Sequence, residues 1–357
     1  MKNNIYKKRA IAVFLFIGFM MMNGNFRSID LSSTQALAFT QASIAEGKAE
    51  CVMEMNSRRI LFASNGDKPL PMASTTKILT AITILDICDD IQEEITIPKQ
   101  AVGIEGSSVY LKENEKYTVE DLLYGLLLRS GNDCATALAL HSCNTIENFS
   151  KQMNYTAQKA GALNSHFSNP HGLPQAEHFT TASDLCYITA YAMENPIYRQ
   201  ITATTYYRPY NWKNKNKMLS IYEGADGGKT GYTKQAGRCL VSTAKRDDMH
   251  LVCTVLNCPA TYERSTQLLD DAFTHYKYVQ LLSKDKALVV HAGDQEYIGY
   301  AKEDFFYPLL EEERSLIEIQ TFPIKNTNKH AKKDEIIGQF EIYLAKRLLF
   351  SGNLYKL

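Results

Sequence analysis

Three short motifs built from serine, lysine and threonine lie in order along the chain: Ser74-Thr75-Thr76-Lys77, Ser130-Gly131-Asn132 and Lys229-Thr230-Gly231. A serine hydroxyl is a weak nucleophile until a neighbouring base takes its proton. Lys77 follows Ser74 at a spacing that places both side chains on one face of a helix. Because a lysine in an apolar, partly cationic site loses proton affinity, it can act as that base. The first motif therefore predicts a nucleophile, Ser74, and a general base, Lys77.

The residues around the first motif predict a buried helix that begins near Ser74. Pro71 ends an extended lead-in, since proline biases the preceding residue away from helix. The run from Ile78 to Ile87 is apolar almost all round, which is typical of a helix in the core. Ser74 would then stand at a helix start, where free N–H groups and the positive end of the dipole favour a developing oxyanion.

The second motif is predicted to lie on a loop between two helices. Residues Thr118 to Asp121 form a capping-box pattern that opens an apolar helix from Leu122 to Leu128. The pattern breaks at residues 129–131, and the next helix is predicted from Asp133 to Leu140. Ser130 and Asn132 would therefore occupy the connection, and such loops carry functional residues more often than the elements they join.

The third motif is predicted to lie on or beside a β-strand. It follows a glycine-rich stretch, residues 224–228, and precedes two β-rich runs, 239–243 and 251–256. The polar residues 245–248 join those runs in the manner of a hairpin. A glycine at Gly231 would let a substrate backbone approach the strand closely.

Together the motifs resemble the D-alanyl-D-alanine carboxypeptidases, which are low-molecular-weight penicillin-binding proteins. The flanking segments Lys68 to Ala73, Asn169 to Leu173 and Thr180 to Ala182 are similar to those of the family, as are Asp226-Gly227 and Ala236-Gly237. The resemblance runs from about residue 49 to about residue 281. It implies an α/β fold, with a β-lactamase/transpeptidase-like domain followed by a small C-terminal β domain.

The resemblance also implies how the chemistry is divided. Ser74 would attack the carbonyl between two D-alanines of a peptidoglycan stem pentapeptide, with Lys77 as base, and form an acyl-enzyme. Ser130 would pass a proton to the leaving amine. The backbone N–H groups of Ser74 and Tyr232 would form the oxyanion hole. β-Lactam antibiotics would acylate the same serine and act as covalent inhibitors.

Substrate-binding roles follow in the same way. Asn132 would hold the substrate backbone and steady the lysine of the first motif. Lys229 would supply positive potential, Thr230 would bind the terminal carboxylate, and Gly231 completes the motif. His250 lies where some members place an arginine that grips that carboxylate, and an ordinary strand-edge histidine is the alternative. We expect no cofactor, and the histidine spacing suggests no metal site.

Three other functions are open on the sequence. A β-lactamase-like hydrolase needs a glutamate that activates the deacylating water, and Glu177 is the nearest in position, although its surroundings resemble the peptidase. A DD-endopeptidase that cuts cross-linked stems is the closest alternative. A wall-binding protein with a decayed site is a third, but every side chain of the three motifs that would do chemistry is present.

Composition limits the class of partner. The 357 residues hold 39 Lys+Arg and 39 Asp+Glu, so the formal net charge of zero argues against nucleic-acid binding. Basic residues before the apolar run from Ala10 to Met22 predict a signal peptide over residues 1–38, with an uncertain cleavage site, or else an uncleaved anchor. Either alternative places the catalytic part outside the cytoplasm, either secreted or associated with the cell wall or membrane.

The remaining chain divides into a peptidase domain at 39–281 and a β domain at 282–357. In the first we predict strands at 50–55 and 60–63 and a final amphipathic helix over 261–281, whose apolar side includes Tyr276 and Val279. In the second we predict strands at 287–290, 316–319 and 336–343. Many relatives end in an amphipathic membrane helix, but residues 344–357 lack a clear apolar stripe, so C-terminal membrane attachment is uncertain.

The eight cysteines are dispersed, and most lie in apolar runs. An even count in an exported chain permits disulfides. Because free cysteine behaves as a small buried hydrophobe, we expect mostly buried thiols.

Overall fold

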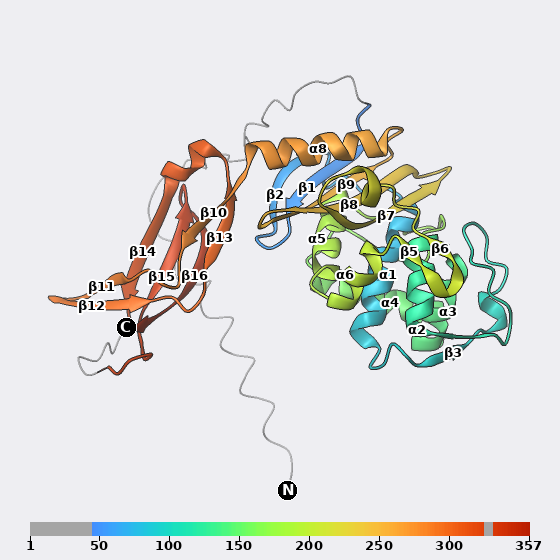
Figure 1. The fold of residues 1–357 in the computed structure, drawn as a ribbon, viewed down its shortest axis with the longest axis horizontal. Coiled ribbons are helices and arrows are strands. Elements are labelled where there is room, and N and C mark those ends of the chain that lie inside the picture. Colours follow the sequence, from blue (N-terminus) through green and yellow to red (C-terminus); the bar gives the residue numbers. More distant parts are fainter. Residues whose placement is uncertain (1–44, 325–330) are drawn as a thin grey trace, which may run out of the picture. The chain divides into compact units, whose positions relative to one another are not determined.

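A five-stranded antiparallel sheet with helices on both faces organises the first part of the described chain (Figure 1). The computed structural model describes residues 45–324 and 331–357, so the leader predicted over residues 1–38 lies outside the described residues. The strands lie in the order β2-β1-β9-β8-β7. Their bounds are β1 Ala49–Glu54, β2 Arg59–Ser64, β7 Ala225–Thr233, β8 Gly237–Arg246 and β9 Met249–Leu256.

Alternating side chains of this sheet enter two separate cores, because successive residues of a strand point to opposite faces. Cys51 and Met53 of β1 face a core shared with six helices, whereas Val52 faces a second core under α7 and α8. The six helices are α1 Thr76–Ile87, α2 Val119–Tyr124, α3 Asn132–Cys143, α4 Ile146–Lys159, α5 Ala182–Ala192 and α6 Pro196–Ala203. The opposite face carries α7 Met218–Ile221 and α8 Thr261–His275.

The helix that follows the first motif is confirmed as a core element. A single 3₁₀ turn, Ala73–Thr75, contains Ser74 and leads directly into α1. Every residue of α1 from Thr76 to Ile84 is buried. The nucleophile candidate is therefore attached to the start of a helix whose first nine residues are all buried.

Ser130 and Gly131 lie between two helices, as predicted, whereas Asn132 is the first residue of α3 and not part of the connection. Thr118 and Asp121 form both bonds of the capping box at the start of α2. The apolar run was predicted as one α-helix to Leu128, but α2 ends at Tyr124 and a π-helical turn, Gly125–Arg129, continues it. Such turns widen the helix and often occur at functional sites.

The third motif lies within β7, and the predicted hairpin is formed by β8 and β9, joined by Asp247 and Asp248. The prediction for α8 was too long, because the helix ends at His275. Tyr276 follows it, and Val279 lies in strand β10 Lys277–Leu282, which pairs with β13 Phe305–Leu309. A pairing partner so far along the chain leaves no local signal.

The C-terminal part forms a second five-stranded sheet in the order β11-β12-β16-β15-β14. Its strands are β11 Leu288–Ala292, β12 Gln295–Tyr300, β14 Ile317–Pro323, β15 Ile336–Leu344 and β16 Arg347–Lys356. The three strands predicted here are confirmed, and the final residues form β16 instead of a helix. The division into domains at residue 282 stays a prediction.

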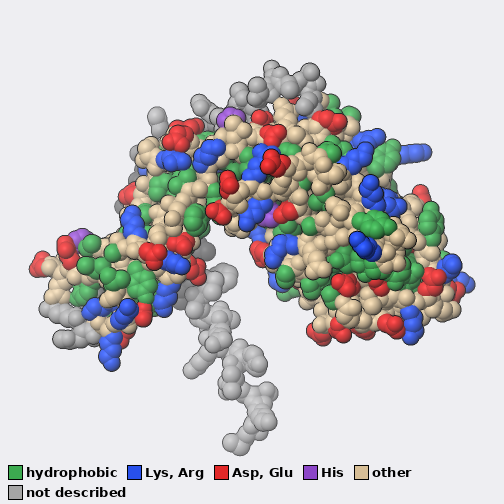
Figure 2. Space-filling view, viewed as in Figure 1, with side chains coloured by type: hydrophobic (Ala, Val, Ile, Leu, Met, Phe, Trp, Pro, Cys, Tyr) green, Lys and Arg blue, Asp and Glu red, His purple; other side chains and the backbone are tan. Residues whose placement is uncertain are grey.

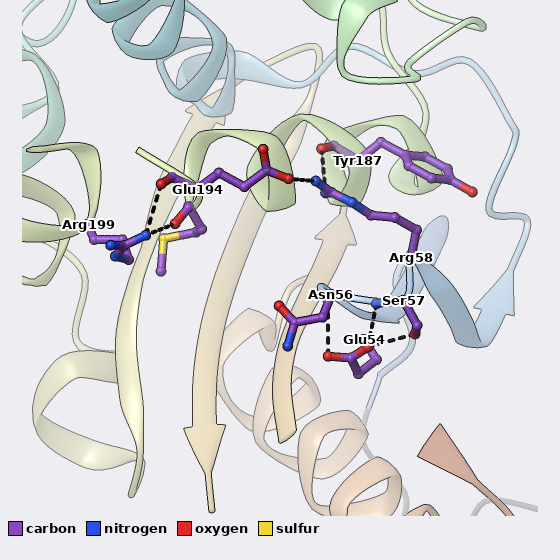
Figure 3. Close-up of polar contacts among 8 residues, drawn as sticks. Glu54, Asn56, Ser57, Arg58, Tyr187, Glu194 and Arg199 are labelled. Atoms are coloured by element: carbon purple, nitrogen blue, oxygen red, sulfur yellow. Dashed lines mark hydrogen bonds and ion pairs between the residues drawn. The ribbon is translucent and has the colours of Figure 1, made fainter. Parts of the chain in front are cut away.

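The turn between β1 and β2 is tied to the end of α5 (Figure 3). Arg58 reaches from the turn to the carbonyl of Tyr187 at 3.4 Å and forms an ion pair with Glu194. Glu54 accepts hydrogen bonds from the backbone of Asn56 and Ser57, which shapes the turn itself. The sheet edge and the helix layer are therefore connected at a point away from the three motifs.

Short hairpins complete the helical side: β3 Glu94–Thr96 with β4 Lys116–Thr118, and β5 Tyr206–Tyr207 with β6 Trp212–Lys213. On the face drawn in Figure 2, acidic and basic side chains are both spread over the surface. All eight cysteines are free and six of them are buried, which confirms the prediction of mostly buried thiols. Within the described residues, no helix has the length and apolar character needed to cross a membrane.

Candidate active site

Lys77 is the centre of the polar network around the nucleophile candidate. Its Nζ lies 3.0 Å from Ser74 Oγ, 2.6 Å from Asn132 Oδ1 and 2.6 Å from the carbonyl oxygen of His171. A neutral amine has two N–H groups and one lone pair. In a neutral Lys77 the two carbonyl-type oxygens would accept the two N–H groups, and the lone pair would then be free to accept the hydroxyl proton of Ser74.

Burial favours that neutral form. The Lys77 side chain is fully buried, and loss of hydration lowers its pKa well below the usual value. The nearby cations Lys229 and Lys215 lower the pKa further, whereas Asp133 raises it. Burial disfavours a charged ammonium and a like charge disfavours it again, so the two largest causes act in one direction.

Asn132 begins α3 and is held on both sides. Its backbone N–H donates to the carbonyl of Ser107 at 2.7 Å, and its side-chain Nδ2 donates to the carbonyl of Glu105. These bonds orient Oδ1 toward Lys77. Ser130, two residues earlier, has a left-handed conformation with φ of 64°, is buried, and lines the same pocket as Ser74.

Gly231 brings β7 against the backbone that carries Ser74. A Cβ at this position would lie 3.0 Å from the carbonyl oxygen of Met72 and 3.1 Å from the amide nitrogen of Ser74. Gly172 approaches the same segment from the opposite side, where a Cβ would lie 2.0 Å from the carbonyl oxygen of Ala73. The sequence predicted close approach of a substrate at Gly231, and the structure adds a close approach of the protein's own backbone.

Lys229 lies behind the strand surface. It is buried, and its Nζ donates to the carbonyl of Thr230 at 3.0 Å. Loss of hydration, and to a smaller extent the charge of Lys215, lowers the pKa of Lys229 to about 7. Its positive charge is therefore partial near neutral pH.

A pocket of about 370 Å³ opens in front of these groups. Five of the predicted residues line it: Ser74, Ser130, Thr230, Gly231 and Tyr232. Lys77, Asn132 and Lys229 lie behind that surface and complete the set of eight. The structure thus brings all three motifs to one place, from a helix start, an inter-helix loop and an edge strand.

The pocket also has lining residues that the sequence did not single out. These are Ser107, Lys215, Arg238, Cys239, Thr261 and Tyr262. Lys215 donates to Ser107 Oγ at 3.2 Å, and Arg238 lies opposite Tyr232 across β7 and β8. No motif marks them, because the fold brings them together from separate segments.

His250 lies in a different pocket. That pocket, of about 590 Å³, is also lined by Glu194, Arg199 and Lys245. His250 Nε2 lies 2.9 Å from Asp226 Oδ2, away from the three motifs. We therefore assign His250 no part in gripping the carboxylate. Glu177 is exposed, and no acidic side chain of the described residues lines the pocket with Ser74.

The segment after α4 supports α1 from the other side. His178 Nδ1 accepts from the backbone N–H of Ser168 at 3.0 Å, so its Nε2–H donates to Thr76 Oγ1 at 3.0 Å. The carbonyl of His171 accepts from Lys77, a backbone contact that no motif in the sequence indicated. Burial lowers the pKa of His171 to about 3 and that of His178 to about 4.

Comparisons with known proteins agree with this geometry. The sequence profile of the S11 peptidases, described as D-alanyl-D-alanine carboxypeptidase, matches residues 35–260. D-alanyl-D-alanine carboxypeptidase DacF of Bacillus subtilis is 30% identical over 304 residues, which covers 80% of this chain and 77% of that protein.

Similarity extends to a solved structure and to a relative that is named for a different activity. The structure of penicillin binding protein 5 from Haemophilus influenzae matches 89% of this chain and 98% of its own, with a TM-score of 0.73 and 27% identity. A D-alanyl-D-alanine endopeptidase of Escherichia coli is 27% identical over 237 residues, 64% of this chain and 76% of that protein.

Proposed function

The chain belongs to the D-alanyl-D-alanine carboxypeptidase family, and on this premise we propose that it removes the terminal D-alanine from peptidoglycan stem pentapeptides. It is a serine hydrolase of the penicillin-binding class. The observation that carries the proposal is the 3.0 Å contact between Lys77 Nζ and Ser74 Oγ inside a buried network. A base and a nucleophile within hydrogen-bond reach are the first requirement of such a reaction.

The steps follow from the positions of the side chains. Lys77 takes the hydroxyl proton of Ser74, whose Oγ attacks the carbonyl carbon of the scissile peptide. The backbone N–H groups of Ser74 and Tyr232 stabilise the resulting oxyanion, a kind of contact worth on the order of 3 kcal/mol per donor. Ser130 delivers a proton to the departing D-alanine nitrogen, and water then hydrolyses the acyl-enzyme.

Asn132 holds the substrate backbone on the side of the acyl donor and keeps Lys77 in place. Thr230 binds the terminal carboxylate, Lys229 supplies positive potential from behind the strand, and Gly231 keeps β7 close to the nucleophile. β-Lactams enter the same pocket and acylate Ser74. Because no acidic side chain of the described residues lines the pocket, rapid deacylation by a glutamate-activated water is disfavoured, and penicillin remains bound as an inhibitor.

A free carboxylate is a better fit to this pocket than an internal peptide. Its lining includes the cations Lys215 and Arg238, together with the hydroxyl of Thr230. Both activities cut an amide, but an endopeptidase acting on cross-linked stems must also accommodate the rest of a second stem beyond that bond, where a carboxypeptidase meets one D-alanine with its free carboxylate. Digestion of purified muropeptides, followed by mass spectrometry, separates the two activities.

Export belongs to the same proposal. Pentapeptide stems lie outside the cytoplasm, so the predicted signal over residues 1–38 would deliver the enzyme to its substrate. We propose an extracytoplasmic location. Cleavage of the predicted signal would release the enzyme, and retention of that segment would anchor it to the membrane. Fractionation of cells, with immunodetection of the full chain, would test this location.

Labelling with a fluorescent penicillin tests the nucleophile. The wild-type protein should form a stable adduct, and Ser74→Ala should form none because no other hydroxyl of the network is paired with Lys77. Ser220→Ala provides a matched control, since that serine lies on α7 and bonds only to the local backbone of Lys217. Equal labelling of folded wild type and Ser74→Ala would contradict the assignment.

A further inference from the structure

The strand that carries the third motif is irregular directly before that motif. The register of β7 against β8 shifts between Ala225 and Gly227, which marks a β-bulge. Gly228 then has φ of 116°, and a Cβ there would lie 2.1 Å from the carbonyl oxygen of Val241. Bulges often lie next to active sites, where they re-aim a side chain. The bulge of β7 therefore sets the register in which the third motif reaches the nucleophile.

Two buried side chains from outside the sheet hold this irregular segment. The hydroxyl of Thr202, near the end of α6, accepts from the N–H of Gly228 at 3.1 Å and donates to the carbonyl of the same residue at 3.3 Å. Asn216, two residues before α7, donates from Nδ2 to the carbonyl of Gly227 at 3.0 Å. Its Oδ1 accepts from the N–H of Met218 at 3.1 Å, which fixes the orientation of the amide. Two consecutive residues before the third motif are thus bonded to other elements.

The need for these bonds follows from the place of β7 in the sheet. It is the last strand in the order β2-β1-β9-β8-β7, so its outer backbone groups face away from the strand ladder. Buried backbone groups require partners, and an edge strand must find them outside the sheet. Thr202 supplies them at Gly228, whereas the residues from Thr230 to Tyr232 line the pocket. The strand is therefore anchored immediately before the stretch that faces the substrate.

Movement of this segment would affect the base and the nucleophile together. Lys229 directly follows Gly228, and its charge is the second cause, after burial, that lowers the pKa of Lys77. A Cβ at Gly231 would lie only 3.1 Å from the amide nitrogen of Ser74, so the strand is also in close contact with the backbone of the nucleophile. The reaction therefore depends on the depth at which β7 lies against α1.

We propose that Thr202 and Asn216 are positioning residues, which hold the third motif at its working distance from Ser74. Neither side chain lines the Ser74 pocket, so both act through the backbone of β7. The inference rests on the proposed acyl-enzyme function and adds the contacts that give the third motif its place.

The surroundings of Lys77 make such a displacement measurable. Charged and titratable groups face Lys77 from several elements: Lys229 of β7, Lys215 before α7, Asp133 and Cys134 of α3, and His171 and His178 of the segment after α4. Of this set, Lys229 lies on the strand that Thr202 anchors. If the strand moves away, Lys77 loses part of the repulsion from Lys229, and its pKa rises. Because Lys215 is adjacent to Asn216, substitution of Thr202 gives the cleaner pH readout.

The test measures acylation of Ser74 by penicillin in stopped flow, at saturating and subsaturating concentrations and over a range of pH. Thr202→Val keeps the shape of the side chain and removes the hydroxyl, whereas Thr202→Ser keeps the hydroxyl. In Thr202→Val we expect the saturating rate constant to fall on the order of tenfold to a hundredfold, the range for a small misplacement of reacting groups. The acid limb of its pH profile should move to higher pH. Thr202→Ser should stay near wild type, and Asn216→Ala should also lower the rate constant.

Controls separate positioning from damage to the fold. Thr189→Val removes another buried hydroxyl, which donates to the carbonyl of Leu185 within α5, and should leave the rate constant and the acid limb unchanged. Rates are expressed per molecule that labels with a fluorescent penicillin, so unfolded protein does not contribute. If Thr202→Val does not fold, Asn216→Ala carries the test.

Wild-type rates in the folded variants that lack these bonds would overturn the inference, as would equal losses in Thr202→Val and Thr202→Ser. A wild-type protein that forms no acyl-enzyme would instead refute the proposed function.

Discussion

Lys77 shows at the residue scale how separate chain segments surround one candidate base. Its spacing from Ser74 is local, so the sequence predicted that both side chains share a helix face. The other two partners, Asn132 Oδ1 and the carbonyl of His171, come from distant positions and are brought in by tertiary structure. The motif therefore predicted the pair, whereas the lowered pKa of Lys77 depends on burial that the motif does not encode.

Replacing Lys77 by arginine tests whether a neutral amine is required. Arginine keeps the positive charge but does not release its proton at ordinary pH. We expect penicillin acylation of Lys77→Arg to fall by at least about a hundredfold, the lower range for general-base catalysis. Stopped-flow acylation kinetics on protein with a native circular-dichroism spectrum would measure this.

The pH profile supplies an independent check on the same residue. The acid limb of acylation should rise as Lys77 loses its proton, and burial lowers the Lys77 pKa, so the limb should lie well below the range of an ordinary lysine. A rate that rises only near pH 10.5, the usual lysine value, would count against a neutral Lys77.

At the element scale, the segment that follows α4 contacts α1 through two buried histidines. His171 contributes its backbone carbonyl to Lys77, and His178 contributes its ring to Thr76. His178 bridges the backbone N–H of Ser168 and the hydroxyl of Thr76, and this pattern requires an unprotonated Nδ1. Both His171 and His178 have lowered pKa values, to about 3 and about 4, chiefly because they are buried. Protonation in the folded state is therefore unfavourable at pH values where the unfolded chain accepts the proton readily.

Stability should consequently fall on acidification. The unfolded histidine value is 6.5 and the folded value of His178 is about 4, so the contribution is complete above pH 6.5, is lost as the pH falls toward 4, and is then constant. Each proton that only the unfolded chain binds adds up to about 1.4 kcal/mol per pH unit to the slope of the free energy of unfolding against pH. His178→Asn keeps an acceptor near the Nδ1 position and should have the shallower slope between pH 6.5 and 5.

Urea unfolding at several pH values would measure that slope, and His291→Asn is the matched control because this histidine is exposed on β11. Identical slopes for wild type and His178→Asn would show that His178 does not couple folding to protons. Stability at pH 7 is not the readout, since the substitution also removes the bond to Thr76.

The elements that the sequence predicted well are those with local signals. Buried apolar runs gave α1 and the strands β1, β2, β8 and β9, and the capping box gave the start of α2. The π-helical turn before Ser130 had no local signal, because Leu126 to Leu128 fit an α-helix equally well. Tyr276 and Val279 fitted the helical period of α8, yet pairing of β10 with β13 outweighed that pattern.

At the scale of the whole molecule, the same limit explains the pocket. Eight site residues could be named in advance because the three motifs contain seven of them and Tyr232 directly follows the third. Lys215, Arg238 and Tyr262 reach the pocket from segments without a motif. Spatial convergence of this kind depends on strand order and register, which a single sequence does not specify. The sequence alone therefore did not predict that the cations Lys215 and Arg238 line the pocket.

A buried ion pair joins segments that are far apart along the chain. Arg59 of β2 pairs with Glu313 at 2.5 Å, and its Nη1 also donates to the carbonyl of Pro308 at 2.6 Å. The guanidinium lies over the rings of Tyr276 and Tyr307, at 5.3 and 5.2 Å from their centroids. Both charged side chains are mostly buried, so solvent screens the pair only weakly.

Removing one partner of this pair should cost more than removing both. Glu313→Gln leaves the guanidinium buried without its counter-charge, a situation that typically costs about 3–5 kcal/mol. Arg59→Met replaces the cation by an apolar side chain that can still pack against the two tyrosine rings. Combined with Glu313→Gln, it removes the uncompensated charge, so the double variant should be more stable than the sum of the two single losses predicts. A double-mutant cycle in urea should give a coupling free energy of about 1–3 kcal/mol.

Because Arg59 and Glu313 lie outside the Ser74 pocket, penicillin acylation rates should stay near wild type in all three variants. Additive losses in stability would show that the pair is not coupled, and a large loss of acylation would show that the contact also supports the active site.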